Sequence, residues 1–286
     1  MLSTGKRVKI AVPNKGRLRE PVIELLKAAG YRFRIKERML YASCANEEAT
    51  LIFVRADDIP KLVESGAVEF GITGQDLVKE KKARVRELLP LDLGRCRLCV
   101  AVHEGARRSL ESLSGGRIAT SFPHITQAWF AARKIPVACL EMSGSLEIMV
   151  GLGLADAIVD IVESGDTLKE NNLVVLEEIG RYQTVLITHR DEARSSRAAS
   201  LRRRIEGICI ARTYSMLEYN ITRRLLKKAE TITPGFESPT VSDLDEQGWC
   251  AVKVMVEKHR VIEAMDRLER LGATAILETE IKNCRL

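Results

Sequence analysis

Short apolar runs alternate with amphipathic stretches along the first 180 residues, and this alternation is what most limits how the chain can fold. The apolar runs 8–12, 51–54 and 70–73 each have the length of a buried strand, and stretches 21–29 and 59–64 between them have helical spacing. Strands that alternate with helices favour a parallel sheet with helices on both faces. We therefore predict an α/β fold for this region.

A second set of strands and helices begins near residue 95. It alternates as the first set does, with strands predicted at 96–102, 117–120, 137–140 and 157–162 and helices at 125–133 and 144–151. A later apolar strand, 184–189, could return to the first sheet, so that the chain crosses twice between two lobes. Two lobes with a double crossover form a hinged cleft that suits a ligand held between them.

The remainder of the chain has a different order of elements. A charged helical connector, 190–206, precedes elements predicted at 214–221, 222–229, 239–244, 249–256, 261–271 and 273–281. Their order, β-α-β-β-α-β, is that of a ferredoxin-like domain. We predict three parts: lobe I (1–94 and 180–212), lobe II (95–179) and a C-terminal domain (213–286).

Composition and charge exclude several classes of protein. The chain is 45% hydrophobic and 29% charged, which is ordinary for a globular protein and excludes a mainly disordered one. No apolar run approaches the ~18 residues that a membrane helix needs, and the N-terminus lacks the apolar core of a secretory signal. We therefore expect a cytoplasmic protein with no membrane partner.

The net charge of +6 suits phosphorylated small molecules as well as nucleic acid. The one sharp basic cluster, 202–204, has no aromatic residues interleaved with it to stack on bases, so we expect a solvated helix face and no nucleic-acid partner.

The seven cysteines are an odd number scattered along the chain, which indicates free thiols in a reducing compartment. Cys96 and Cys99 lie three residues apart in a predicted strand, where their side chains would point to opposite faces. This spacing favours structural thiols over a metal or redox site. The four histidines show no metal-ligand spacing either.

The strongest motif is GLADAIVDIVESGDTL, residues 153–168. The predicted strand 157–162 runs into Ser164-Gly165-Asp166-Thr167, where small and hydroxyl residues present backbone N–H groups to a phosphate. Asp160 and Glu163, near the exit of this strand, could accept hydrogen bonds from sugar hydroxyls. From these residues alone, a helix cap that binds no ligand is an equally good interpretation.

Other predicted strands also end in polar residues. Lys15 and Arg17 flank a glycine after the first strand, Arg55 and Asp76 follow the next two, and Arg38 precedes another short apolar stretch. Ligands of open α/β sheets bind beyond the carboxyl ends of the strands, so these residues predict a polyphosphate site. A solvated cap before the helix at residue 21 is the alternative for Lys15 and Arg17.

Several of these segments together resemble the long form of the ATP phosphoribosyltransferases. They are VPNKGR, VRADDIP, FGITGQDLV, RIATSFPH, GSLEIMVGLGLADAIVDIVESGDTL, TPGFESPT and CRL, in this order. The resemblance implies two catalytic lobes similar to type II periplasmic binding proteins, and a regulatory ferredoxin-like domain. It also implies the first step of histidine biosynthesis: N1 of ATP is joined to C1 of 5-phosphoribosyl 1-pyrophosphate, and pyrophosphate is released. Mg²⁺ as cofactor, histidine as inhibitor, and homo-oligomers (dimers and hexamers) are implied as well.

The resemblance assigns roles to individual residues. Lys15, Arg38 and Arg55 would stabilise the leaving diphosphate. Phosphoribosyl pyrophosphate would be bound by Asp156, Asp160, Glu163, Ser164, Gly165, Asp166, Thr167 and Leu168, with Asp160 also at the metal. The nucleotide would be bound by Arg17, Asp76 and Glu147. Histidine would be bound where domains of two subunits meet, by groups at Asn220, Ser238, Thr240 and Ala275.

Two other classes of protein stay open at this point. One is a non-catalytic protein of the same two-lobed fold that captures an anion. The other is a transcriptional regulator with an effector domain of this fold, which only the basic cluster supports. Pyrophosphate release that requires both ATP and phosphoribosyl pyrophosphate would exclude both alternatives.

Overall fold

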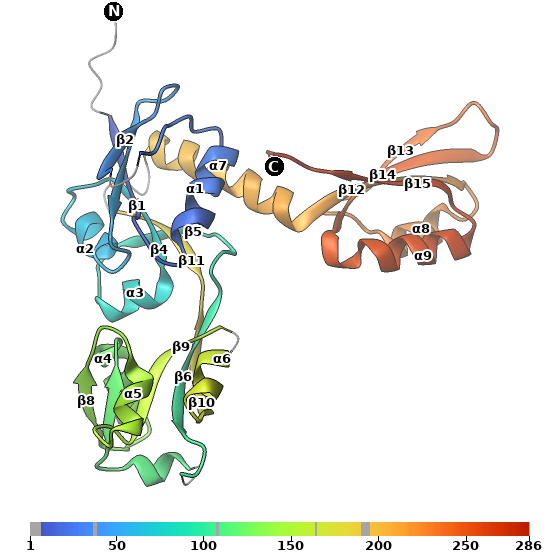
Figure 1. Cartoon of the computed structure of the whole chain (residues 1–286). Coiled ribbons are helices and arrows are strands. Elements are labelled where there is room, and N and C mark those ends of the chain that lie inside the picture. Colours follow the sequence, from blue (N-terminus) through green and yellow to red (C-terminus); the bar gives the residue numbers. More distant parts are fainter. Residues whose placement is uncertain (1–6, 37–38, 107–108, 164, 190–194, 286) are drawn as a thin grey trace, which may run out of the picture. The chain divides into compact units, whose positions relative to one another are not determined.

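The computed structural model describes residues 7–36, 39–106, 109–163, 165–189 and 195–285 (Figure 1). The chain divides into two compact units. Unit 1 comprises Met1–Glu24 and Tyr31–Arg202, and unit 2 comprises Leu25–Gly30 and Arg203–Leu286. Unit 1 contains two sheets, which form lobes I and II, and unit 2 contains one sheet. None of the helices in the described part of the chain is long and apolar enough to cross a membrane.

Lobe I contains a six-stranded sheet with the order β2-β3-β1-β4-β11-β5. Its strands are β1 (Val8–Pro13), β2 (Tyr41–Ser43), β3 (Ala49–Val54), β4 (Phe70–Gly74), β5 (Arg86–Pro90) and β11 (Thr184–Thr188). The chain between them forms α1 (Arg19–Ala28), α2 (Ile59–Glu64) and α3 (Gln75–Glu80). Ile59 and Val63 of α2 pack on Ala11, Val185 and Ile187 of the sheet.

The sheet of lobe I is mixed, whereas the sequence pattern had predicted a parallel one. β1 is parallel to β3 and β4, but β2 is antiparallel to β3, and β11 is antiparallel to both β4 and β5. Hydrophobic periodicity identifies a strand and not its direction. β11 enters directly from a strand of lobe II, with no crossover helix to reverse it, and so it runs against β4.

Lobe II contains a five-stranded sheet with the order β10-β6-β9-β7-β8. Its strands are β6 (Cys96–His103), β7 (Arg117–Thr120), β8 (Ala138–Glu141), β9 (Ala157–Val162) and β10 (Leu173–Tyr182). Its helices are η1 (Leu110–Leu113), α4 (Pro123–Ala132), α5 (Leu146–Gly151) and α6 (Asp166–Glu170). Cys96 and Cys99 are free thiols buried in separate core clusters, as the strand prediction requires.

The chain crosses twice between the lobes. It leaves lobe I after β5, forms the sheet of lobe II, and returns from β10 to β11 in the first sheet, which confirms the predicted double crossover. The predicted lobe limits at residues 94/95 and 179/180 fall between β5 and β6 and within β10. As exact domain boundaries, these limits and the limit at 212/213 stay predictions.

Unit 2 contains a four-stranded antiparallel sheet with the order β13-β14-β12-β15. Its elements are β12 (Tyr214–Thr222), α8 (Leu226–Ile232), β13 (Thr240–Asp243), β14 (Trp249–Glu257), η3 (Lys258–Arg260), α9 (Val261–Leu271) and β15 (Thr274–Glu280), and α7 (Ser196–Thr213) precedes them. This is the predicted ferredoxin-like order. Helix α8 begins four residues later than predicted, because Thr222 still pairs with Trp249 as the end of β12.

The core of unit 2 follows from simple periodicity. Alternate residues of β12, including Leu217, Tyr219 and Ile221, are buried on one face of the sheet. Val261, the first residue of the amphipathic helix α9, and Leu268, about two turns further along, are buried in the same cluster. The other face of β12 therefore carries the residues at even numbers.

Candidate active site

The carboxyl edge of the lobe I sheet brings together the residues predicted after β1 and β3. The two strands run parallel with Pro13 opposite Val54, and the Asn14 N–H donates to the Val54 carbonyl at 2.8 Å. The turns that carry Lys15 and Arg55 therefore leave the sheet side by side. Both side chains are exposed, so their charges face solvent or a ligand.

Arg17 links this edge to lobe II. Its guanidinium donates to the Gly94 carbonyl and to the Glu163 carboxylate, both at 2.9 Å, and to the Cys96 sulfur at 3.2 Å. Glu163 follows β9 of lobe II, so this ion pair joins the strand exits of the two lobes. The pair is partly exposed, with 30% of the Arg17 side chain and 55% of the Glu163 side chain accessible.

Asp76 is a buried carboxyl at the exit of β4. It is only 2% exposed, and burial raises its pKa above the ordinary value, although the nearby Arg17 charge opposes this. Gly74 makes room for it, since a Cβ at that position would clash with the Asp76 carboxylate. Among the residues that the structure describes, Oδ1 of Asp76 has no hydrogen-bond partner. A ligand donor that reached this oxygen would remove the cost of an unpaired buried acceptor.

A pocket of about 290 Å³ lies at the exit of β9 in lobe II. It is lined by Glu147, Asp160, Ile161, Val162, Glu163, Gly165, Thr167 and Leu168. Five of the residues predicted to bind phosphoribosyl pyrophosphate thus share one pocket, together with Glu147, which had been predicted on the nucleotide side. Gly165 has a φ of +87°, a conformation that favours glycine. This conformation turns the chain from the strand into α6.

Three carboxylates line this pocket, those of Glu147, Asp160 and Glu163, and the surroundings of Asp160 change its acidity. Burial, with a smaller contribution from the Glu147 charge, raises the pKa of Asp160 from an ordinary 3.8 to about 6. The Ile161 N–H donates to Oδ1 of Asp160 at 2.8 Å and opposes this shift. Two adjacent acceptors of this kind suit a ligand with hydroxyl donors or a cation.

The carboxylates of this pocket fit a site for Mg²⁺ in which water and the substrate supply the remaining ligands. Within the described residues, no group of three or more histidine, cysteine or acidic side chains could hold a metal ion. Mg²⁺ is usually bound by one or two carboxylates together with waters and substrate phosphates. Asp160 with Glu147 fits that mode, in which the substrate completes the site.

Two of the residues predicted to bind phosphoribosyl pyrophosphate do not line this pocket. Asp156 precedes β9, where its carboxylate accepts the Arg117 N–H at 2.7 Å. Asp160, the first residue of β9 that lines the pocket, is four residues further along the strand, or roughly 13 Å away at 3.3 Å per residue. Asp166 begins α6 but does not line the pocket. Arg38 and Ser164 lie outside the described residues.

A larger pocket of about 590 Å³ contains residues that sequence reasoning missed. Its lining is Gln75, Arg95, Cys96, Arg97, Val162, Glu163, Arg181, Tyr182 and Gln183. Arg97 and Arg181 both pair with Glu178, at 3.7 and 2.8 Å. Its volume lies in the range of roughly 300–1,000 Å³ that is usual for small-molecule sites. Arg95 and Arg97, around the start of β6, were the feature of the sequence that could have indicated this pocket. They lie two residues apart, and such residues share a face of a strand.

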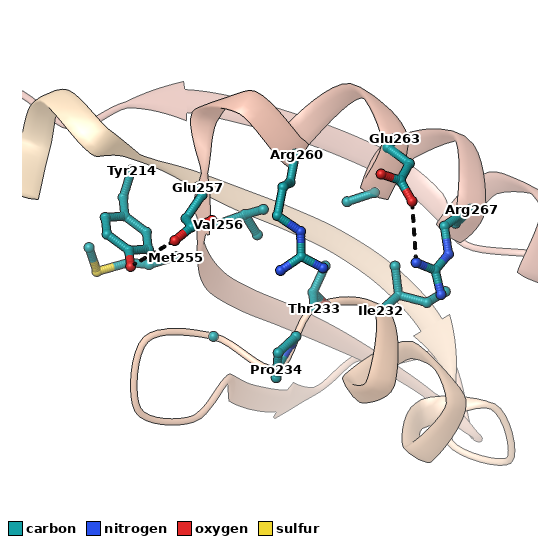
Figure 2. A pocket seen from close by; sticks show the side chains of 12 residues that line it. Tyr214, Ile232, Thr233, Pro234, Met255, Val256, Glu257, Arg260, Glu263 and Arg267 are labelled. Atoms are coloured by element: carbon teal, nitrogen blue, oxygen red, sulfur yellow. Dashed lines mark hydrogen bonds and ion pairs between the residues drawn. The ribbon is translucent and has the colours of Figure 1, made fainter. Parts of the chain in front are cut away.

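Unit 2 has a smaller pocket of about 100 Å³ between α8, α9 and β14 (Figure 2). Figure 2 shows the Arg260 side chain extending toward Thr233 and Pro234, next to the ion pair of Glu263 with Arg267 at 3.5 Å. None of the four residues predicted to bind histidine lines this pocket.

The predicted histidine residues lie elsewhere in unit 2. Asn220 stands between the buried Tyr219 and Ile221, so it faces the side of the sheet away from the core. Ser238, Thr240 and Ala275 are exposed, and Ala275 has a φ of +49°. None of the four lines a pocket described above, and their role stays a prediction.

Comparison with known proteins finds a matching family and several similar proteins. The family model for ATP phosphoribosyltransferase matches residues 55–207, and the model for the C-terminal domain of the same family matches residues 211–283. A protein of Rhodopirellula baltica named ATP phosphoribosyltransferase is 47% identical over 98% of this chain and 94% of its own. One from Nocardia farcinica is 41% identical over 97% and 99%.

A solved structure is also similar. It is the ATP phosphoribosyl transferase (HisG:HisZ) complex from Thermotoga maritima, with a TM-score of 0.63 and 29% identity over 71% of this chain and 98% of that chain.

Proposed function

Because the chain belongs to the ATP phosphoribosyltransferase family, the pentosyltransferases of histidine biosynthesis, we propose that it joins N1 of ATP to C1 of 5-phosphoribosyl 1-pyrophosphate. The observation that best supports this reaction is the pocket at the exit of β9, where Asp160 and Glu147 face the turn of Gly165 and Thr167. Carboxylates suit the hydroxyls of a ribose, and a turn with N–H groups and a hydroxyl suits its phosphate.

In the proposed mechanism the adenine N1 already carries the attacking lone pair, so no activated side chain is required. The barrier is cleavage of the bond from C1 to the diphosphate oxygen, which leaves positive charge on the sugar. Catalysis then depends on orientation and on stabilisation of charge. Gly165 and Thr167 would hold the 5′-phosphate, while Asp160 would accept from the ribose hydroxyls and stabilise the cationic sugar.

The leaving diphosphate gains negative charge as its bond to C1 breaks. Lys15 and Arg55 stand at the adjacent exits of β1 and β3 and are exposed, so both can meet it. Arg38 is proposed for the same role. Mg²⁺, when held by Asp160 with Glu147 and the substrate phosphates, would neutralise further charge on the diphosphate.

ATP would occupy the side of the site that carries Arg17 and Asp76. The unpaired oxygen of Asp76 can accept from an adenine amino group or a ribose hydroxyl. The adjoining 590 Å³ pocket supplies Arg95, Arg97 and Arg181 for phosphates. Glu163 lines both pockets, which favours two substrates bound next to each other.

The finer regulatory features are part of the same proposal. We propose inhibition by histidine through the ferredoxin-like domain, a homo-oligomer of dimers and hexamers, and action in the cytoplasm. The similarity of residues 211–283 to the C-terminal domain of the family supports a separate module. The open sheet face that carries Asn220 supports a site completed by a second subunit.

The test is pyrophosphate release by the full chain with ATP and phosphoribosyl pyrophosphate, added singly and together with Mg²⁺. Release only with both substrates is expected, along with a product that carries the sugar on N1 of adenine. Tight binding of phosphoribosyl pyrophosphate without any release would instead favour the non-catalytic binding protein.

A further inference from the structure

Helix α4 of lobe II begins without a capping side chain of its own. The first N–H groups of a helix have no partner within it and need acceptors. The N-cap residue is Phe122, which is apolar, and its own N–H donates to Thr120 Oγ1 at 2.9 Å. Pro123 has no N–H. The N–H groups of His124 and Ile125 therefore need acceptors from elsewhere in the chain.

Glu80, the last residue of α3 in lobe I, supplies both acceptors. One oxygen of its carboxylate accepts the His124 N–H at 3.0 Å, and the other accepts the Ile125 N–H at 3.0 Å. The His124 Nδ1 also lies 3.0 Å from the first oxygen. Glu80 is only 3% exposed. A carboxylate at this end of a helix is also favoured by the helix dipole.

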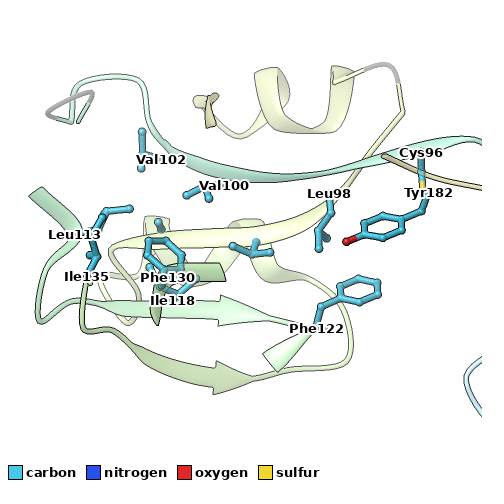
Figure 3. Packing of buried hydrophobic residues seen from close by; sticks show 12 residues of the cluster. Cys96, Leu98, Val100, Val102, Leu113, Ile118, Phe122, Phe130, Ile135 and Tyr182 are labelled. Atoms are coloured by element: carbon cyan, nitrogen blue, oxygen red, sulfur yellow. The ribbon is translucent and has the colours of Figure 1, made fainter. Parts of the chain in front are cut away.

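The rest of α3 packs against lobe II as well. Leu77 packs on the core cluster shown in Figure 3, and the Lys79 ammonium lies 4.9 Å from the ring centre of Tyr182 in that cluster. At its other end α3 begins with Gln75, which lines the 590 Å³ pocket. This short helix thus joins the larger pocket to the cap of α4.

The start of α4 is in turn bonded to the strand that carries Asp160. The Thr120 hydroxyl donates to the Val159 carbonyl at 2.8 Å and lies 3.3 Å from the Thr126 hydroxyl in the first turn of α4. β7 and β9 are parallel, so the loops that follow them leave the same edge of the sheet. A shift of α4 relative to β9 would break these buried bonds. The position of Glu80 therefore also determines where lobe I lies relative to the edge of the lobe II sheet that carries Asp160.

We propose that Glu80 is a positioning residue: it docks lobe I on the start of α4 and so sets the strand exits of the two lobes at the spacing that the reaction needs. This inference rests on the proposed function. The ion pair of Arg17 with Glu163, which also joins the lobes, is partly exposed and contributes little. Loss of the Glu80 carboxylate would instead leave two N–H groups without an acceptor.

The first test is amide hydrogen exchange at His124 and Ile125 in the full chain without substrates. The variants are Glu80→Ala and Glu80→Gln, which keeps one acceptor oxygen. The matched control is Glu64→Ala. Glu64 ends α2 and accepts from Lys61 and from the backbone and side chain of Arg84, at 2.9, 3.0 and 3.2 Å, all within lobe I.

Exchange at both amides should be at least about tenfold faster in Glu80→Ala, intermediate in Glu80→Gln, and unchanged in the control. Unchanged exchange in Glu80→Ala would overturn the docking contact.

The second test measures steady-state kinetics together with the Kd of phosphoribosyl pyrophosphate alone. Glu80→Ala should lower kcat/KM for ATP about tenfold or more and weaken that Kd by much less, because the 290 Å³ pocket that would hold the ribose and its phosphate belongs to lobe II. An effect no larger than that of Glu64→Ala, or an equal loss of phosphoribosyl pyrophosphate binding, would overturn the positioning role. If the wild type releases no pyrophosphate, the proposed function fails, while the exchange experiment still decides the docking contact.

Discussion

Replacing Asp160 with Asn should stabilise the chain while it removes activity. Burial and the Glu147 charge raise the pKa of Asp160 from 3.8 to about 6, so the ionised carboxylate is less stable in the folded state than in the unfolded one. Between these two values the folded state binds more protons, and stability therefore falls as the pH rises through this window. Asn keeps an oxygen for the Ile161 N–H and has no charge to bury.

The size of the effect follows from the two pKa values. At 1.36 kcal/mol per pH unit, ionisation of Asp160 costs about 3 kcal/mol at pH 7. The cost falls to about 2 kcal/mol at pH 5, where most of the folded population is protonated. Asp160→Asn should therefore be more stable than the wild type by up to these amounts, and the difference should shrink on acidification.

The assay is chemical unfolding at pH 5, 6, 7 and 8, followed by the fluorescence of Trp129 in lobe II. Trp249, the other tryptophan, is changed to Phe in every variant so that unit 2 does not contribute. The control is Asp58→Asn, an exposed carboxyl in lobe I whose side chain makes no cap hydrogen bond. A stability difference that is the same at pH 5 and pH 8, or a variant less stable than the wild type at pH 7, would refute the reasoning.

Four further predictions, made on five variants, test other parts of the chain. Thr167→Ala should raise the KM for phosphoribosyl pyrophosphate roughly ten- to a hundredfold, because a hydrogen bond to a charged group is lost; an equal rise for ATP would show that the turn is only structural. Arg55→Ala should lower kcat more than it weakens binding, because charge on the diphosphate grows in the transition state; normal turnover with weaker binding would remove it from the catalytic residues. Gly74→Ala should destabilise lobe I by about 1–3 kcal/mol in urea unfolding, since its Cβ clashes with Asp76; unchanged stability would show that Asp76 can move away freely. Asn220→Ala and Thr240→Ala should each weaken inhibition in a histidine titration, and full sensitivity of both variants would place the effector elsewhere.

The fold was largely readable because its elements have strong periodicity. The runs that became β1 and β9 are buried strands, and the spacing that predicted a helix at 261–271 matches α9. Direction and register were not readable, since they depend on what a strand pairs with. The antiparallel β11 and the late start of α8 both follow from partners distant in sequence, namely β4 and Trp249.

The sequence indicated where the candidate residues lie when their placement depends on a strand exit, but not when it depends on which end of an element a residue occupies. Lys15 and Arg55 follow neighbouring strand ends because β1 and β3 are adjacent and parallel. Asp156 and Asp160 are four residues apart in sequence but lie toward opposite ends of β9. Glu147 joins Asp160 only through the packing of α5 beside β9, which no local motif reveals.

Absent signals in the sequence also carry information about long-range contacts. The segment Ser121-Phe122-Pro123-His124 begins a helix, yet its N-cap is apolar, and the Ser121 hydroxyl donates away from the helix to the Met142 carbonyl. Since buried N–H groups are nearly always paired, a helix start with no local acceptor predicts one from a distant segment. A carboxylate is the strongest such acceptor. The missing cap of α4 was therefore a readable sign of a tertiary contact, although only the structure identifies Glu80 as the partner.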